Sequence, residues 1–279
     1  MFFQKADKKW KKVLAGPIDQ QSKFLNKICQ VNSRDALVLR ERFFDNIEFP
    51  LMTEIFKSVK KIIARGEFDP SFRDLIYDRL LRIIDIEHLY PEEYEEGNEC
   101  NGDDDNVIFG ENYHVYTACY DDLDLLISFI NSRSDIKSVC DLGSGTGRAL
   151  LYMALMMDKK LDYLGLELVE ERVEFTNSVA SYFKLDNVKF ETCDFLENPQ
   201  AFAGRDVYYL YDSVGTDNVP RLIAHFKDLI DSGAKFYLLF ISGWDEIMLN
   251  SLDNLAGLEK LESHQSRKQQ GRVVNFYRS

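Results

Sequence analysis

Hydrophobic residues along the chain follow two different periods, and the change between them divides the sequence. Between residues 18 and 86 apolar positions recur every three or four residues, which is typical of amphipathic helices. From residue 113 onward, short apolar runs alternate with helical periodicity, as they do in doubly wound α/β folds. We therefore expect a small helical N-terminal domain at 18–86 and an α/β domain at 113–279.

The α/β domain is expected to hold a Rossmann-like, seven-stranded sheet with a terminal antiparallel strand. The expected strands are 138–142, 161–167, 187–191, 206–211, 234–241 and a final hairpin of 258–263 and 272–277 at the sheet edge. The expected helices are 149–157, 169–184, 219–230 and one that follows Trp244. Another is expected to run through Leu123, Leu126, Ile127 and Ile130, with Asp121, Asp122 and Asp124 in its first turn. The fourth strand is almost continuously apolar, which suits the interior of a parallel sheet.

A glycine-rich turn, Asp141-Leu142-Gly143-Ser144-Gly145-Thr146-Gly147, joins the first strand to its helix. Alternate glycines allow positive φ angles and close approach of a ligand to the main chain. The helix N-terminus behind them favours an anionic group. A dinucleotide fingerprint needs a third small residue where Arg148 or Leu150 stands, so the pattern departs from nicotinamide and flavin sites.

The acid-x-Gly-x-Gly-x-Gly pattern resembles the first motif of the class I S-adenosylmethionine-dependent methyltransferases, over roughly Tyr113 to Arg278. Glu167 ends the second strand, where a carboxylate can accept hydrogen bonds from both ribose hydroxyls. Asp194 follows the third strand and could accept from an adenine amino group, while Phe195 packs on the ring. The alternative for both acids is a cap on a neighbouring turn.

Three stretches carry a narrower resemblance: residues 115–123, the glycine turn, and Cys193-Asp194-Phe195-Leu196. They are similar to segments of the non-SET lysine methyltransferases of the disruptor-of-telomeric-silencing type, in which a helical lobe precedes the fold. That family's Gly-Glu after Val-Tyr is Thr117-Ala118 here, and its Asn-Asn-Phe after the fourth strand is Tyr211-Asp212-Ser213. The resemblance implies a protein-lysine N-methyltransferase.

The resemblance and the strand ends together define the expected site. The cofactor-binding residues for S-adenosyl-L-methionine are expected to be Tyr116, Thr117, Asp141, Leu142, Gly143, Ser144, Gly145, Gly147, Glu167, Leu168, Asp194 and Phe195. The catalytic residues around the acceptor channel are expected to be Tyr116, Tyr211, Asp212 and Ser213. Asp212 either orients the acceptor amine and takes its proton or caps the turn into the next helix.

Charge is distributed unevenly along the chain, whose formal net charge is −13. Residues 1–65 hold 14 Lys and Arg against 7 Asp and Glu, and a lysine-rich basic tail occupies 1–17. An acidic linker or loop is expected at 87–112. This balance disfavours nucleic acid as a partner, except through the basic N-terminal region, and we expect a protein substrate. The alternatives are a small-molecule or RNA methyltransferase and a non-catalytic regulator that binds the cofactor.

The five cysteines are widely spaced and include no Cys-x-x-Cys pair, as is usual for reduced thiols in a cytosolic protein. The four histidines are scattered, so no metal site is expected. The sequence also has no signal-peptide core and no apolar run of about 20 residues that could span a bilayer. A soluble cytoplasmic protein is expected, with export without a cleaved signal left open.

Overall fold

A computed structural model describes residues 118–157, 159–242, 246–266 and 271–279, together with 12, 15–17, 19–20, 77–78 and 81. The chain divides into two units, Met1–Asp85 with Tyr182–Lys184 and Ile86–Ser181 with Leu185–Ser279. The predicted basic tail, helical domain and acidic linker lie almost wholly outside the described residues. These three expectations stay predictions.

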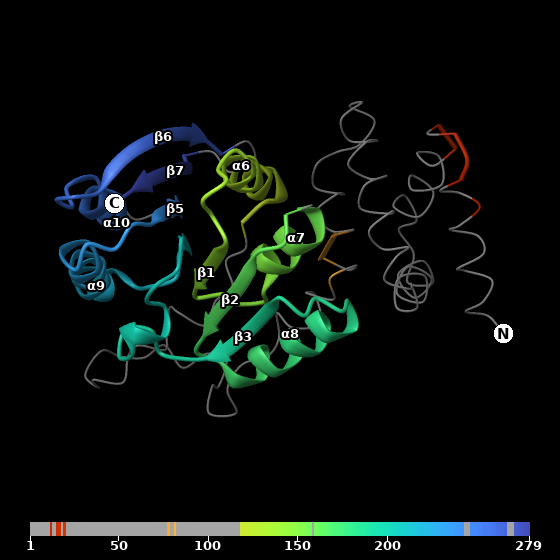
Figure 1. The fold of residues 1–279 in the computed structure, drawn as a ribbon, viewed down its shortest axis with the longest axis horizontal. Helices are drawn as coiled ribbons and strands as arrows, with labels where there is room; N and C mark the ends of the chain where they lie inside the picture. The colour runs from red at the N-terminus through yellow and green to blue at the C-terminus, as the bar shows by residue number, and fades with distance from the viewer. Residues whose placement is uncertain are drawn as a thin grey trace. The chain divides into compact units, whose positions relative to one another are not determined.

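The second unit is built on one seven-stranded sheet with the order β3-β2-β1-β4-β5-β7-β6 (Figure 1). Its strands are β1 Ser138–Leu142, β2 Asp162–Glu167, β3 Val188–Thr192, β4 Val207–Tyr211, β5 Tyr237–Ile241, β6 Glu259–Gln265 and β7 Val273–Arg278. The first five are parallel, and β7 runs antiparallel to both β5 and β6. The carboxyl ends of β1 to β5 therefore meet at one edge of the sheet.

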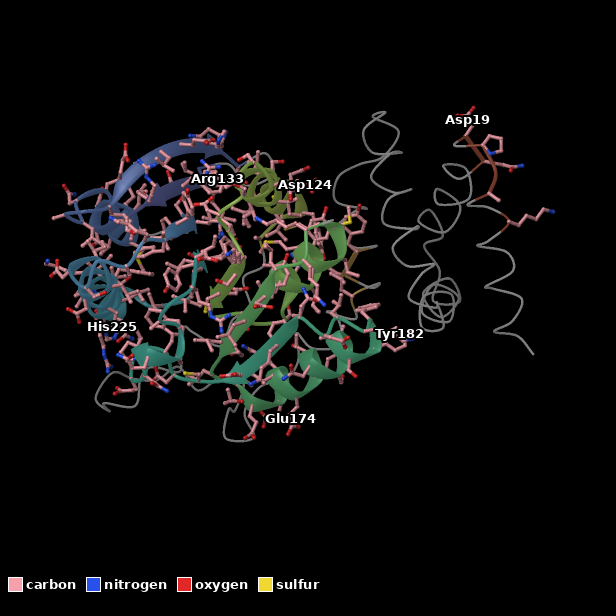
Figure 2. All side chains as sticks on the ribbon, viewed as in Figure 1. Asp19, Asp124, Arg133, Glu174, Tyr182 and His225 are labelled. Carbon is pink, nitrogen blue, oxygen red and sulfur yellow. The ribbon has the colours of Figure 1, made fainter. Side chains whose placement is uncertain are left out.

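Helices cover both faces of this sheet. They are α6 Tyr120–Asn131, α7 Arg148–Met156, α8 Glu170–Tyr182, α9 Val219–Asp231 and α10 Glu246–Asp253, with short 3-10 turns η2 Pro199–Ala201 and η3 Thr216–Asn218. Arg133 lies just after α6, stacks over Phe129 and pairs with Glu262 of β6 at 3.7 Å (Figure 2). This contact connects α6 to the final hairpin.

Neighbouring residues on one strand face opposite sides, because side chains alternate along a β-strand. Tyr208 belongs to a buried cluster with Phe226 of α9 and Leu252 of α10. Tyr209, the next residue, is electrostatically coupled to Asp122 of α6 and to charges at the start of α7. The core thus has one layer under α9 and α10 and another under α6 and α7.

The predicted fold class is confirmed, down to the single antiparallel strand near the sheet edge. The largest boundary difference is at β5, which begins at Tyr237 rather than residue 234. The reason is the end of α9: Gly233 takes a φ of 85°, and Ala234 N donates to Leu229 O at 3.1 Å. The next residues thus complete the helix terminus before the strand starts.

None of the helices in the described part of the chain is both long and apolar enough to cross a membrane. The described residues also contain no group of three or more His, Cys, Asp or Glu side chains arranged to hold a metal ion.

Candidate active site at the carboxyl ends of the strands

The glycine turn after β1 has the backbone geometry that only glycine adopts readily. Gly143, Gly145 and Gly147 have φ angles of 84°, 52° and 70°. Gly143 N and Ser144 N both donate to Leu166 O of β2, at 2.9 and 2.8 Å, which fixes the turn against the neighbouring strand. The turn is therefore a rigid part of the sheet edge, and its last glycine directly precedes α7.

At two of these glycines, the Cβ of any other residue would also clash with neighbouring side chains. A Cβ on Gly147 would lie 2.3 Å from Thr176 Cγ2 and 2.8 Å from Phe190 Cζ. A Cβ on Gly143 would lie 2.6 Å from Ser213 Cβ, so the residue that follows β4 by two positions touches the turn after β1. The predicted acceptor side and the predicted cofactor loop are consequently in direct contact.

Glu167, the last residue of β2, binds the glycine turn through its carboxylate. Its Oε2 accepts a hydrogen bond from Gly145 N at 2.7 Å, and its Oε1 accepts one from Val169 N at 3.1 Å. Arg172 of α8 lies 3.5 Å from Oε1, and only 2% of its side chain is exposed. A buried charged residue held by two backbone amides and a cation is a well-oriented acceptor of hydrogen bonds.

Asp141 is brought next to this group, as the sequence predicted. It is 3% exposed, and burial raises its pKa well above the ordinary value, with the nearby negative charge of Glu167 acting in the same direction. Two buried acids of adjacent strands thus face the same turn. Such a pair at strand ends is characteristic of a functional site, because it is unfavourable for folding alone.

Asp194 and Phe195 have structural contacts of their own. Asp194 Oδ1 accepts hydrogen bonds from Leu196 N at 2.9 Å and Glu197 N at 3.2 Å, which is the capping role that the sequence left as an alternative. The Phe195 ring is buried and packs edge-to-face on Phe202. Within the described residues, no hydrogen bond or ion pair joins Asp194 to Asp141 or Glu167. Its contact with adenine stays a prediction.

The predicted acceptor residues Tyr211, Asp212 and Ser213 follow one another at the end of β4. Asp212 has a φ of 45°, a left-handed conformation that Asp and Asn tolerate better than most residues. Burial raises the pKa of Asp212 to about 6. A strained, half-buried acid beside a ligand-binding turn is a candidate for proton transfer. Tyr116 and Thr117 lie outside the described residues, and Leu168 is half-buried beside Glu167.

Arg272 is a member of this site that the sequence analysis missed. It precedes β7, is 3% exposed, donates from Nη1 to the hydroxyl of Tyr211 and forms an ion pair with Asp212 Oδ2 at 3.2 Å. The sequence assigned this position to the final hairpin without a role. No local signal marks its role, because an arginine is usually exposed unless it is paired, and its partners are distant in sequence.

The arrangement fits an adenosyl-sulfonium cofactor in its donor and acceptor groups. Ser144 Oγ, Thr146 Oγ1 and Ser213 Oγ are buried and have no hydrogen-bond partner among the described residues. Native proteins rarely leave such atoms unpaired unless a ligand or water binds them. The Glu167 carboxylate can accept hydrogen bonds from ribose hydroxyls, and the three hydroxyl groups can donate to the carboxylate of an amino-acid moiety.

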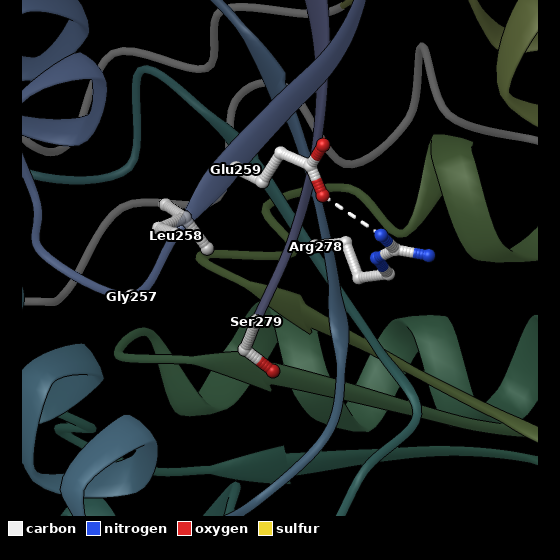
Figure 3. Close-up of a pocket in the computed structure, with 5 residues that line it drawn as sticks. All are labelled: Gly257, Leu258, Glu259, Arg278 and Ser279. Carbon is white, nitrogen blue, oxygen red and sulfur yellow. Dashed lines mark hydrogen bonds and ion pairs between the residues drawn. The ribbon is translucent and has the colours of Figure 1, made fainter.

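A separate cavity of about 360 Å³ is lined by Gly257, Leu258, Glu259, Arg278 and Ser279 (Figure 3). Arg278 Nη2 and Glu259 Oε2 form an ion pair of 2.7 Å at its wall. Arg278 pairs in register with Tyr237, the first residue of β5. The cavity is therefore at the amino end of that strand, opposite the glycine turn, and plays no part in the site.

Comparison with known proteins identifies the kind of domain. Residues 133–232 match the family model described as a methyltransferase domain. None of the curated proteins matches the chain in sequence. The matched segment runs from just before β1 to the end of α9, and so includes the turn, Glu167, Asp194 and Asp212.

Solved structures with a similar fold include three methyltransferases. Precorrin-6y C5,15-methyltransferase from Geobacter metallireducens is 13% identical, with 63% of this chain and 94% of that chain covered and a TM-score of 0.44. A SAM-dependent O-methyltransferase from Thermotoga maritima is 13% identical, with 60% and 67% covered and a TM-score of 0.44. Geranyl diphosphate methyltransferase with GPP and sinefungin is 12% identical, with 57% and 77% covered and a TM-score of 0.44. These likenesses are too low to bear on the acceptor.

The expected enzyme class is confirmed by the family match on residues 133–232. Residues 133–232 thus belong to a methyltransferase domain, the sheet has the order of the class I fold, and S-adenosyl-L-methionine is the methyl donor that this enzyme class implies. The match does not reach the narrower lysine-methyltransferase family.

Proposed function

We propose that this protein transfers a methyl group from S-adenosyl-L-methionine to the side-chain amine of a lysine in a protein substrate. The observation that carries the proposal is the position of Asp212. This half-buried acid ends β4 within one residue of the contact between Ser213 and the glycine turn. A carboxylate beside the donor is suited to a basic acceptor, because it can orient an amine and accept its proton.

The protein's main task in this reaction is to position the methyl donor and the acceptor amine. The cofactor supplies an activated methyl group on a sulfonium, so the amine lone pair forms the new N–C bond as the C–S bond breaks and a neutral thioether leaves. Asp141, Glu167 and the glycine turn would hold the adenosyl part. Before transfer the lysine must lose a proton, which Asp212 can accept and which desolvation favours by lowering the amine pKa.

The resemblance of residues 115–123, 141–147 and 193–196 to non-SET lysine methyltransferases supports a protein lysine over other amines. The Asp/Asn-Pro-Pro-aromatic signature of enzymes that methylate exocyclic amines of nucleic-acid bases is absent at 212–215, which read Asp-Ser-Val-Gly. The net charge of −13 also disfavours a nucleic-acid acceptor. A small-molecule amine is the alternative acceptor.

The proposal is tested by incubating the protein with methyl-labelled S-adenosyl-L-methionine and a cell lysate, then fractionating the label. We expect label in protein, on lysine side chains identified by mass spectrometry of the modified peptides. Asp212→Asn serves as the background control, since it should bind the cofactor and transfer little. Label confined to small molecules or RNA would overturn the lysine assignment.

The pH dependence of transfer provides a prediction specific to Asp212. Its raised pKa of about 6 means that the carboxylate form, which can accept a proton, predominates only above that pH. We expect kcat to fall as the pH drops through about 6, and Asp212→Asn to remove this limb and to lower kcat at pH 8 by about 100-fold. Asp217→Asn, at an exposed acid of η3, should keep both the limb and the rate. An acid limb that persists in Asp212→Asn would assign it to another group.

A further inference from the structure

We propose that Arg272 is a positioning residue for the methyl acceptor, holding the Tyr211 hydroxyl and the Asp212 carboxylate in place from the residue just before the antiparallel strand β7. The inference rests on the proposed function, because it concerns the acceptor side of that same site. The final hairpin would then help to position the acceptor residues, in addition to forming the edge of the sheet.

The contacts of Arg272 meet both predicted acceptor residues at once. Its Nη1 donates to the Tyr211 hydroxyl and lies 3.2 Å from Asp212 Oδ2, and its guanidinium carbon is 4.9 Å from the centre of the Tyr211 ring. The three side chains are 3%, 8% and about one-fifth exposed. The contact with Asp212 is an ion pair, and Oδ2 has no hydrogen-bond partner among the described residues. A guanidinium group has several N–H donors in a fixed plane, so one arginine can bond the Tyr211 hydroxyl and attract the Asp212 carboxylate at the same time.

The segment that contains Arg272 is hydrogen-bonded to its neighbours in the fold. Arg272 O accepts from Ser266 N at 2.9 Å, across the end of the β6–β7 hairpin. Ser266 Oγ donates to Asp122 Oδ2 of α6 at 2.7 Å, and Asp122 is fully buried. Val273 N donates to Ser242 Oγ, and Ser242 N donates to Val273 O, both at 2.8 Å. The arginine is thus carried by a segment tied to α6 and to the end of β5.

The direction of β7 explains how a residue so late in the chain reaches this site. Val274 pairs with Ile241, the last residue of β5, because β7 runs antiparallel to it. The start of β7 therefore lies at the carboxyl ends of the parallel strands, where the glycine turn and Asp212 are. A hairpin in the opposite direction would put this arginine at the amino ends.

The ion pair of Arg272 with Asp212 differs from an ordinary structural ion pair, because it bears on the ionisation of Asp212. Among the described residues, Arg272 is the charged group in contact with Asp212. Tyr211 is on the same strand, and Asp122 of α6 is linked to the hairpin through Ser266. Burial is what raises the pKa of Asp212. A guanidinium 3.2 Å from the carboxylate favours its charged form, so we expect Arg272 to oppose that effect on the group proposed to accept the proton.

The first test follows the ionisation of Asp212 directly, by 13C NMR of selectively labelled aspartate carboxyl groups, with Asp212→Asn used to assign the resonance. We expect Arg272→Gln to raise the pKa of Asp212 by about one unit, since a positive charge at this distance typically lowers a carboxyl pKa by one to three units. Arg272→Lys should keep the pKa near that of the wild type. Arg278→Gln, an exposed arginine at the other end of β7, should leave it unchanged.

The second test separates transfer from cofactor binding. We expect kcat to fall at least tenfold in both Arg272→Gln and Arg272→Lys, because lysine keeps the charge but cannot hold two oxygens in one plane. The dissociation constant for S-adenosyl-L-methionine should stay within twofold of the wild type in both. Should Arg272→Gln fail to fold, the same comparison with Arg272→Lys decides the question.

An Asp212 pKa that does not move in Arg272→Gln would overturn the inference, and so would a wild-type kcat in both variants. Loss of cofactor affinity in parallel with kcat would also overturn it, by placing Arg272 on the donor side. The NMR titration needs no acceptor. It therefore decides the role of Arg272 even if the wild-type enzyme methylates no lysine, which would reject the proposed function alone.

Discussion

Replacing Gly147 with alanine is expected to abolish cofactor binding and to lower the free energy of unfolding by about 2–5 kcal/mol. A non-glycine residue in the left-handed region costs about 1–2 kcal/mol, and Gly147 has a φ of 70°. Forcing an extra methyl group into a packed site costs about 1–3 kcal/mol more. The new Cβ would lie 2.3 Å from Thr176 Cγ2 and 2.8 Å from Phe190 Cζ.

Neither neighbour of Gly147 can move away easily. Thr176 is fully buried, and its hydroxyl donates to Arg172 O at 2.6 Å. The backbone of Phe190 exchanges two hydrogen bonds with the side chain of Asn177, at 3.0 and 2.8 Å. The strain must therefore be relieved by the glycine turn and the first turn of α7. These are the segments expected to bind the cofactor, and so stability and affinity should fall together.

Two variants separate the close contact from the backbone conformation. Gly204→Ala has a similar φ of 78° with nothing within 4 Å of the new Cβ, so it should cost only about 1–2 kcal/mol. Gly147→Ala combined with Thr176→Ser removes the methyl group that clashes first but keeps the hydroxyl bond. This pair should recover part of the lost stability.

Denaturant unfolding and calorimetry with S-adenosyl-L-methionine measure both effects on the same proteins. If Gly147→Ala loses no more stability than Gly204→Ala, the glycine turn does not pack against α8 as closely as the structure indicates. If it loses stability but binds the cofactor normally, the turn is structural and the binding site is elsewhere.

The parts of the site that could be predicted from the sequence are those set by local patterns. The positive φ angles of Gly143, Gly145 and Gly147 follow from alternate glycines between a strand and a helix. The meeting of Asp141 with Glu167 follows from parallel pairing of β1 and β2, because residues at the ends of adjacent parallel strands share one edge.

Other features depend on choices that the local pattern leaves open. Asp194 can cap the next turn or reach a ligand with the same side chain, and the structure shows the cap. Phe195 follows it and points into the layer under α9, where it contacts Phe202. Whether an aromatic residue at a strand end faces the ligand or the core is decided by packing of segments distant in sequence.

Arg272 shows most clearly what a sequence motif cannot supply. It is 61 residues from Tyr211, and their contact exists only because β7 inserts between β5 and β6 in the antiparallel direction. No short spacing encodes that contact. The hairpin was expected from its alternating pattern, but the consequence of its direction for the acceptor site becomes visible only in three dimensions.

Glu167→Ala is expected to lower affinity for S-adenosyl-L-methionine by at least about 100-fold and to destabilise the fold by about 3 kcal/mol. The loss of affinity follows from removing the predicted acceptor for the ribose hydroxyls, since each hydrogen bond to a charged group contributes about 1.5–3 kcal/mol. The destabilisation arises because Arg172, which is 2% exposed, loses its carboxylate partner.

Glu167→Gln separates the loss of cofactor affinity from the loss of stability. An amide has one oxygen where the carboxylate has two, so it can accept from Gly145 N or from Val169 N but not from both as Glu167 does. We expect it to retain more stability than Glu167→Ala while still binding the cofactor about tenfold more weakly. Glu174→Ala, at an exposed position of α8 labelled in Figure 2, should change neither quantity.

Chemical denaturation gives the stabilities of these three variants, and calorimetry gives their affinities. Wild-type affinity in Glu167→Gln and Glu167→Ala would mean that the carboxylate only fastens the turn to α8. A loss of affinity in Glu167→Gln out of proportion to its stability is the result that a bound ribose predicts. The Glu167 carboxylate would then bind both the amide of the glycine turn and the ribose of the cofactor. It can reach both because it lies at the end of β2, beside the turn.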